Sequence, residues 1–260
     1  MSALSRWTRS YRRELRRCLK GAPPTLGGQE SRARERLFFA SLAHLPVLER
    51  ESRFRSRVHP YSQQERATNT VFIHIPKTAG NSIARAVFGS DSGLGHDRAR
   101  RYLEADPHRF AESFKFGIVR NPYDRLLSAH TYLTAEPIGW NDRAFRAAYL
   151  DSTGSFSEFV ASLEEESVWG KVSQWTHFVP QHEFLCIGSA LVVDLVGQFE
   201  DLDGALKRVS EVMRLGSVAL PHLNASEGPK WPGEFTPAMK QIINHRYRRD
   251  FEMFGYELEA

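Results

Sequence analysis

Two short apolar runs stand out in the pattern of hydrophobic and polar positions, and each is followed by a polar loop and then by helical spacing. Residues 71–75 (VFIHI) end at a proline and are rich in β-branched side chains, which predicts a strand buried on both faces of a parallel sheet. After the loop 76–82 (PKTAGNS), Ile83, Ala86 and Val87 recur at helical spacing. A strand, a tight loop and a helix aim backbone N–H groups at one point, so this unit predicts an anion site.

The second run, residues 114–119 (FKFGIV), predicts another buried strand. Asn121 is a good helix N-cap and Pro122 suits the first helical position, so a helix should begin there and continue through residues 126–133. Arg120 then lies at the carboxyl end of the strand. In open α/β sheets this is the edge where ligands bind.

The rest of the chain also alternates between predicted strands and helices, which indicates the α/β class. Helical spacing recurs at residues 156–163, 202–215 and 237–254, and residues 192–199 resemble another buried strand. Residues 134–155 lack a clear period, so we expect a loop there that faces a substrate. We interpret residues 68–260 as one α/β domain and residues 1–67 as a helical N-terminal extension.

Charge is concentrated in that extension. Residues 1–60 hold 14 basic and 5 acidic side chains, of 35 and 31 in the whole chain. Residues 1–20 have the spacing of a basic amphipathic helix, and a second helix is expected at about 31–50. Residues 1–20 fit either a peripheral contact with a membrane or an acidic partner, or a solvated helix. With the basic excess confined to this arm, we expect no nucleic-acid partner.

Composition excludes several classes of protein. A chain of 260 residues with 41% hydrophobic residues has enough apolar surface for a core, so a collagen-like or disordered chain is excluded. Two cysteines provide neither a disulfide framework nor a thiolate cluster, and we expect no metal. No apolar stretch reaches the length of a membrane span and no signal peptide is apparent, so we expect a cytoplasmic protein.

The chemistry of the two loops favours phosphate binding. The first loop is not a Walker A sequence, because its lysine precedes its glycine. Lys77 can act as a point charge, Thr78 and Ser82 as hydroxyl donors, and Gly80 permits a close approach to the backbone. The alternative is a turn with a solvated lysine.

At the second loop, Arg120 and Ser128 offer a guanidinium and a hydroxyl beside the same sheet edge. The alternative for Arg120 is an ion pair with Asp124. Two anion sites of this kind suit a nucleotide that carries phosphates on both its 5′ and 3′ positions.

Residues 73–82 (IHIPKTAGNS) and 116–128 (FGIVRNPYDRLLS) resemble the sulfotransferase type 2 family, which uses 3′-phosphoadenosine 5′-phosphosulfate (PAPS). Shorter matches follow in the same order, at residues 95–96, 156–160, 180–181, 184–185, 199–202, 220–224 and 250–256. The resemblance spans about residues 70–256. It implies a P-loop-like domain with a central parallel sheet flanked by helices, and a PAPS cleft.

Carried over residue by residue, the resemblance assigns roles to both loops. The 5′-phosphosulfate would be held by Lys77, Thr78, Ala79, Gly80, Asn81 and Ser82. The 3′-phosphate would be held by Arg120 and Ser128. The resemblance implies a sulfuryl acceptor hydroxyl, in a glycan, with adenosine 3′,5′-bisphosphate (PAP) as product. The lack of an N-terminal membrane anchor makes a soluble bacterial-type enzyme the better comparison.

Catalysis then needs two groups. One stabilises the negative charge that develops on the leaving oxygen, and the other is a general base. Lys77 is the candidate for the first role. His96 is the candidate base, with His130 as the alternative, while His74 is interpreted as structural. Two other functions stay open at this point, namely a P-loop kinase or NTPase and a nucleotide-binding module without catalysis.

Overall fold

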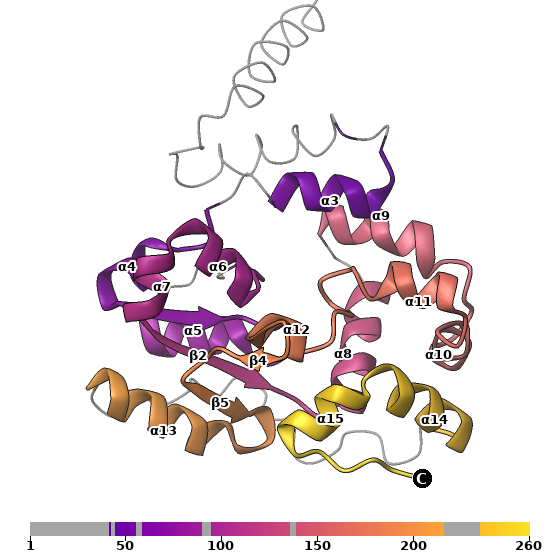
Figure 1. Ribbon diagram of the computed structural model, residues 1–260. Helices are drawn as coiled ribbons and strands as arrows, with labels where there is room; N and C mark the ends of the chain where they lie inside the picture. The colour runs from indigo at the N-terminus through magenta and orange to yellow at the C-terminus, as the bar shows by residue number, and fades with distance from the viewer. Residues whose placement is uncertain (1–41, 43–44, 56–58, 90–94, 136–138, 216–234) are drawn as a thin grey trace, which may run out of the picture. The chain divides into compact units, whose positions relative to one another are not determined.

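In the part of the chain that the structure describes, three parallel strands form the central sheet (Figure 1). This computed structural model describes residues 42, 45–55, 59–89, 95–135, 139–215 and 235–260. The order is β1 (Thr70–Ile73), β2 (Phe114–Val119) and β5 (Leu195–Gln198). The predicted α/β class with a central parallel sheet flanked by helices is therefore confirmed.

Each of the first two strands leads directly to one of the two loops. β1 is followed by the loop at 76–79 and by α5 (Gly80–Phe88), and β2 is followed by Arg120 and by α8 (Pro122–Thr134). β1 and β2 are parallel neighbours, and Ile73, the last residue of β1, pairs with Gly117 of β2. Both loops therefore leave the same edge of the sheet.

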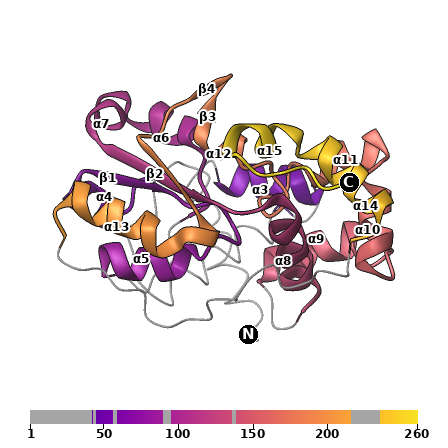
Figure 2. The same cartoon turned by 90° about the horizontal axis from the view of Figure 1, so that it is seen from below.

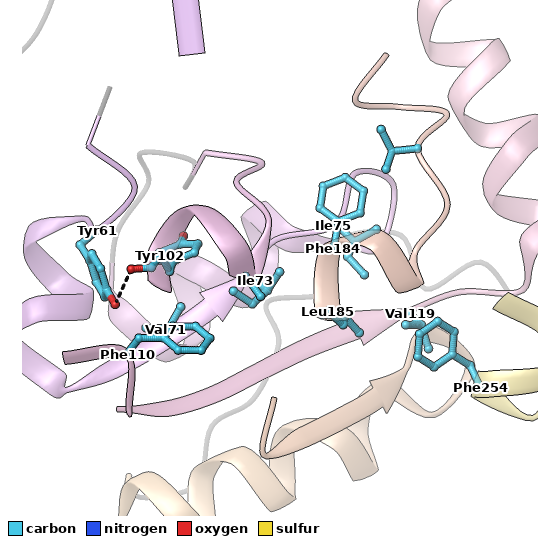
Figure 3. Close-up of a cluster of buried hydrophobic side chains, with 12 residues drawn as sticks. Tyr61, Val71, Ile73, Ile75, Tyr102, Phe110, Val119, Phe184, Leu185 and Phe254 are labelled. Atoms are coloured by element: carbon cyan, nitrogen blue, oxygen red, sulfur yellow. Dashed lines mark hydrogen bonds between the residues drawn. The ribbon is translucent and has the colours of Figure 1, made fainter. Parts of the chain in front are cut away.

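Helices cover both faces of the sheet (Figure 2). Side chains of α5 and of α13 (Leu202–Met213) pack on one face, among them Ile83, Val87, Leu206 and Val209. The other face packs against α6 (Ala99–Ala105), α7 (Pro107–Glu112), α12 (His182–Leu185) and α15 (Arg248–Phe254). Figure 3 shows this second cluster, in which the Tyr61 hydroxyl donates to the Tyr102 carbonyl oxygen at 3.3 Å.

Contacts divide the chain into two units. One contains α3 (Val47–Arg55) and α9 (Trp140–Tyr149), and the other, residues 60–135 and 152–260, contains the sheet and both loops. The second unit begins with α4 (Gln63–Thr68), where Ser62 and Glu65 form a capping box. The predicted boundary between residues 67 and 68 stays a prediction.

The other described elements all belong to the second unit. They are α10 (Phe156–Ser162), α11 (Glu166–Val172), the hairpin β3 (Cys186–Ile187) and β4 (Ala190–Leu191), the 3-10 turn η1 (Phe199–Asp201), and α14 (Pro237–Arg246). No helix among the described residues is both long and apolar enough to span a membrane.

Two expectations about secondary structure are wrong. Residues 140–149, expected within a loop, form α9, whose Phe145 is fully buried. The single helix expected over 237–254 is divided at Tyr247, whose φ of −112° and ψ of 17° are not helical. There the buried Tyr247 hydroxyl donates to the Phe178 carbonyl oxygen at 2.9 Å, a tertiary contact that the local pattern does not reveal. The predicted helix at 1–20 and most of the one at 31–50 lie outside the described residues.

Candidate functional site

The first loop has an unusual backbone. Lys77 and Ala79 both adopt left-handed conformations, with φ of 73° and 62°, which non-glycine residues rarely do. Left-handed residues in such a loop turn successive N–H groups toward one point and form an anion-binding concavity. Ala79 is also the N-cap of α5 and has no capping side chain, so the first-turn N–H groups of this helix have no acceptor within the helix. This backbone is of the kind that can bind an anion.

The polar side chains of this loop differ in their surroundings. The Thr78 hydroxyl is fully buried and donates to the Ile75 carbonyl oxygen at 2.8 Å, so in this structure it shapes the loop. Asn81 is exposed and Ser82 partly exposed in the first turn of α5. The predicted phosphate contacts of all three stay predictions.

Side-chain packing requires a glycine at position 80, and the sequence does not reveal this requirement. A Cβ atom at Gly80 would overlap the imidazole ring of His74. His74 is 5% exposed and stacks on Phe72, with ring centroids 5.5 Å apart. This agrees with the interpretation of His74 as a structural histidine. In this structure the His74 ring of the same domain fills the space beside the Gly80 Cα.

We expect Gly80→Ala to destabilise the protein by about 1–3 kcal/mol, because the added methyl group overpacks the site against His74. Thermal unfolding measures the effect. Gly170→Ala is the matched control, since Gly170 lies inside α11 and a Cβ there meets nothing within 4 Å. The control should be neutral or stabilising by up to about 1 kcal/mol. If His74→Ala fails to recover stability in the Gly80→Ala background, the packing explanation is wrong.

A series of rings connects Lys77 with His96. The Lys77 ammonium lies 4.4 Å from the centroid of the Tyr132 ring, and Tyr132 contacts His177 at 4.9 Å between centroids. The His177 and His96 centroids are 6.0 Å apart, and those of His96 and His74 are 4.2 Å apart. The two residues predicted to be catalytic thus adjoin one aromatic cluster at the carboxyl end of β1.

The hydrogen bond of His96 determines which of its nitrogens can accept a proton. Its Nδ1 lies 3.0 Å from the carbonyl oxygen of His74. A carbonyl oxygen only accepts, so Nδ1 must carry the proton in this bond, and Nε2 of the neutral ring is then the basic nitrogen. His96 is partly exposed, as a base that meets a substrate must be.

His130, the alternative base, has a different environment. Its ring lies between those of Phe156 and Phe159, at centroid distances of 5.1 and 5.2 Å. Burial lowers the pKa of His130 to about 4. A base is most effective when its pKa is near the working pH, so this environment favours His96.

Arg120 is a cation without a carboxylate partner at ion-pair distance among the described residues. Its Nη1 donates to the Lys77 carbonyl oxygen at 3.3 Å, and its guanidinium carbon lies 4.4 Å from the Phe199 ring centroid. Burial lowers the pKa of Arg120, and the nearby charges of Asp124 and Glu200 oppose this shift. The alternative of an ion pair with Asp124 is not observed. The Arg120 Nε is buried and has no hydrogen-bond acceptor among the residues that the structure describes.

Arg125 is a structurally central residue that the sequence reasoning missed. It is 2% exposed and donates only to carbonyl oxygens: Nε to Pro76 at 3.1 Å, Nη1 to Val179 at 2.9 Å and Nη2 to His177 at 3.3 Å. It thereby joins α8 to the start of the first loop and to the segment that carries His177.

The structure brings most of the predicted site together. Lys77, Gly80, Arg120 and their loops share one sheet edge, and Ser128 is partly buried on α8. The sequence assigns no role to Gln181 or Asp250, although both lie in short segments of the resemblance, 180–181 and 250–256. Among the described residues, no group of three or more His, Cys, Asp or Glu side chains is arranged to hold a metal ion.

A family model described as "Sulfotransferase family" matches residues 62–257. The chain belongs to this family. The match covers both loops and every described element of the sheet, so the sulfotransferase family accounts for the P-loop-like arrangement of two strand–loop–helix units.

The chain is also similar to carbohydrate sulfotransferase 14 from three organisms. It is 28% identical over 174 residues to the Mus musculus and Homo sapiens proteins, and 26% identical over 179 residues to the Danio rerio protein. These matches cover 58% of this chain and 44–46% of the relatives, so the chain spans less than half the length of the relatives it matches. No solved structure gave a significant match.

Proposed function

We propose that this chain transfers a sulfuryl group from PAPS to a hydroxyl group of a carbohydrate. The observation that carries the proposal is the pairing of two cationic loops on adjacent parallel strands, joined where Arg120 Nη1 donates to the Lys77 carbonyl oxygen at 3.3 Å. This arrangement suits one ligand with anionic groups at two positions. Family membership and the names of the relatives support sulfuryl transfer and a carbohydrate acceptor.

In the proposed mechanism, residues 77–82 hold the 5′-phosphosulfate and Arg120 and Ser128 hold the 3′-phosphate. His96 Nε2 accepts the proton of the acceptor hydroxyl as its oxygen forms the new bond to sulfur. The bond between sulfur and the bridging oxygen breaks, and that oxygen leaves with the 5′-phosphate of PAP. Lys77 and the loop N–H groups stabilise the charge that grows there.

The decisive experiment measures transfer and binding separately. Transfer of labelled sulfate from PAPS is assayed against a panel of glycans, because the relatives' names indicate a carbohydrate. Thermal unfolding is followed with PAP and with ATP, each with and without Mg²⁺. Stabilisation by PAP without Mg²⁺ supports the proposal, and a preference for ATP with Mg²⁺ would replace it with a kinase or NTPase. PAP binding without transfer to any acceptor would favour a binding module.

A cytoplasmic location and a contact made by residues 1–20 also stay predictions.

We expect Arg120→Ala to weaken binding of PAP much more than binding of adenosine 5′-phosphate, because only PAP carries the group that Arg120 would contact. A small loss for both ligands is expected as well, since the Lys77 carbonyl oxygen loses its donor. Ser128→Ala should have the same selective effect to a smaller degree, because a neutral donor forms the weaker bond. Calorimetric titration with both nucleotides measures the ratio.

Arg246→Ala is the matched control. Its side chain is 6% exposed and donates to the Leu163 carbonyl oxygen at 2.8 Å, so its loss should lower stability and leave the affinity ratio unchanged. Equal losses for PAP and adenosine 5′-phosphate in Arg120→Ala would mean that Arg120 only supports the fold.

A further inference from the structure

The backbone of Arg120 is held by a single side chain, that of Gln181. The Arg120 N–H donates to Gln181 Oε1 at 2.8 Å, and Gln181 Nε2 donates to the Arg120 carbonyl oxygen at 2.8 Å. We propose that Gln181 is a positioning residue that sets Arg120 for the 3′-phosphate of the donor. This inference rests on the proposed function and adds a residue to its 3′-phosphate site.

The need for such a residue follows from the register of the sheet. The last pair between β1 and β2 is Ile73 with Gly117, and the last pair between β2 and β5 is Val119 with Gln198. Arg120 therefore lies three residues beyond the end of the β1–β2 ladder and one residue beyond the end of the β2–β5 ladder. No strand among the described residues accepts its N–H group or donates to its carbonyl oxygen there. A primary amide presents one acceptor and two donors, so Gln181 replaces a strand neighbour at this point.

Gln181 is itself held firmly. It is fully buried, and its own N–H donates to Asp250 Oδ2 at 2.6 Å. Asp250 Oδ1 accepts from the His182 N–H at 2.9 Å and lies 2.6 Å from His182 Nδ1. Asp250 is fully buried on α15. The position of the Arg120 backbone is thus determined by a chain of contacts that begins on α15, far from the sheet edge in sequence.

This backbone position matters because little else holds the Arg120 side chain. The guanidinium has one long hydrogen bond, to the Lys77 carbonyl oxygen, and one ring contact, with Phe199. A displacement of the backbone would move the guanidinium relative to both loops. A misplacement of about 1 Å in a binding or catalytic group can reduce function about 10²-fold.

The first test is Gln181→Met, which removes both hydrogen bonds at nearly constant volume. The affinities for PAP and adenosine 5′-phosphate are measured at a temperature where the variant is folded. We expect the PAP preference to fall by about 10–100-fold while binding of adenosine 5′-phosphate changes little. Gln198→Met is the matched control, since the Gln198 Nε2 donates to the Phe254 carbonyl oxygen at 2.9 Å and its loss should not alter the preference. An unchanged PAP preference in folded Gln181→Met would overturn the inference.

A second variant tests the hydrogen-bond pattern itself. In Gln181→Glu, the protonated carboxyl offers one acceptor and one donor, which are the two groups that the amide uses toward the Arg120 backbone, whereas the ionised form offers only acceptors. We expect a near wild-type PAP preference at low pH that falls as the pH rises and Glu ionises against the Arg120 carbonyl oxygen. The wild-type affinities measured at each pH serve as the reference. They include any effect of protonation of the phosphates and of the neighbouring ionisable side chains His182, Asp250, Asp124 and Glu200. The same pH dependence in both proteins would overturn the inference, and this variant also decides the matter if Gln181→Met does not fold.

The two levels of the proposal fail in different ways. A wild-type protein that does not prefer PAP over adenosine 5′-phosphate contradicts the 3′-phosphate site and with it the proposed donor. If the wild type prefers PAP and Gln181→Met keeps this preference, only the role of Gln181 is contradicted.

Discussion

Lys77→Met is expected to reduce turnover by about 10²–10³-fold, because it removes one preorganised donor from the oxygen on which charge develops in the transition state. PAPS affinity should fall much less, since that charge is only partly present in the bound donor. The Lys77 ammonium lies 4.4 Å from the Tyr132 ring centroid. Steady-state kinetics together with PAP titration separate turnover from binding.

Lys240→Met is the control for this prediction. Lys240 forms an ion pair with Glu259 at 3.0 Å, so its loss removes a lysine charge outside the two loops. Turnover of the control should match that of the wild type. Turnover of Lys77→Met within a few-fold of the wild type would exclude Lys77 from the stabilisation of the leaving oxygen.

The second large effect is expected for His96→Ala, with turnover reduced by about 10²–10⁴-fold and PAP affinity nearly intact. A protonated imidazole cannot accept a further proton, so wild-type activity should fall at low pH if His96 is the base. The variant should lack this acidic limb. The His74 carbonyl oxygen, at 3.0 Å from His96 Nδ1, fixes the tautomer on which this prediction depends. The pH dependence of turnover provides the measurement.

His130→Ala is the paired control. The His130 ring packs between Phe156 and Phe159 and its pKa is lowered to about 4, so its loss should cost stability and leave the acidic limb in place. If the limb disappears in His130→Ala and persists in His96→Ala, the assignments of the two histidines must be exchanged.

The features that the sequence predicted are those with local signals. β2 has the predicted bounds, and the Asn121 side chain caps α8 by accepting from the Tyr123 N–H at 3.0 Å. Pro122 occupies the first turn as expected. Caps, prolines and apolar runs act within a few residues, so they can be recognised without knowledge of the fold. The two cationic loops were found for the same reason.

The supporting residues were missed because their partners are distant in sequence. Gln181 binds the backbone of Arg120, 61 residues away, and Arg125 binds carbonyl oxygens of His177 and Val179, 52 and 54 residues away. Backbone groups are present at every residue, so an amide or guanidinium that binds them leaves no complementary side chain to find in the sequence. The overlap between Gly80 and the His74 ring is likewise visible only after folding.

The buried guanidinium of Arg125 has a consequence for the protein before it meets its ligand. Only carbonyl oxygens accept its hydrogen bonds. Burial lowers the pKa of Arg125, the charge of Arg120 adds to this shift, and Tyr247 and Asp250 oppose it. Arg120 and Arg125 thus place two cations close together at partly or fully buried positions, where a bound anion would add a counter-ion. The nucleotide would then serve as a folding cofactor as well as a substrate. Under the proposed function, the empty chain should be degraded faster in cells when adenosine bisphosphates are scarce.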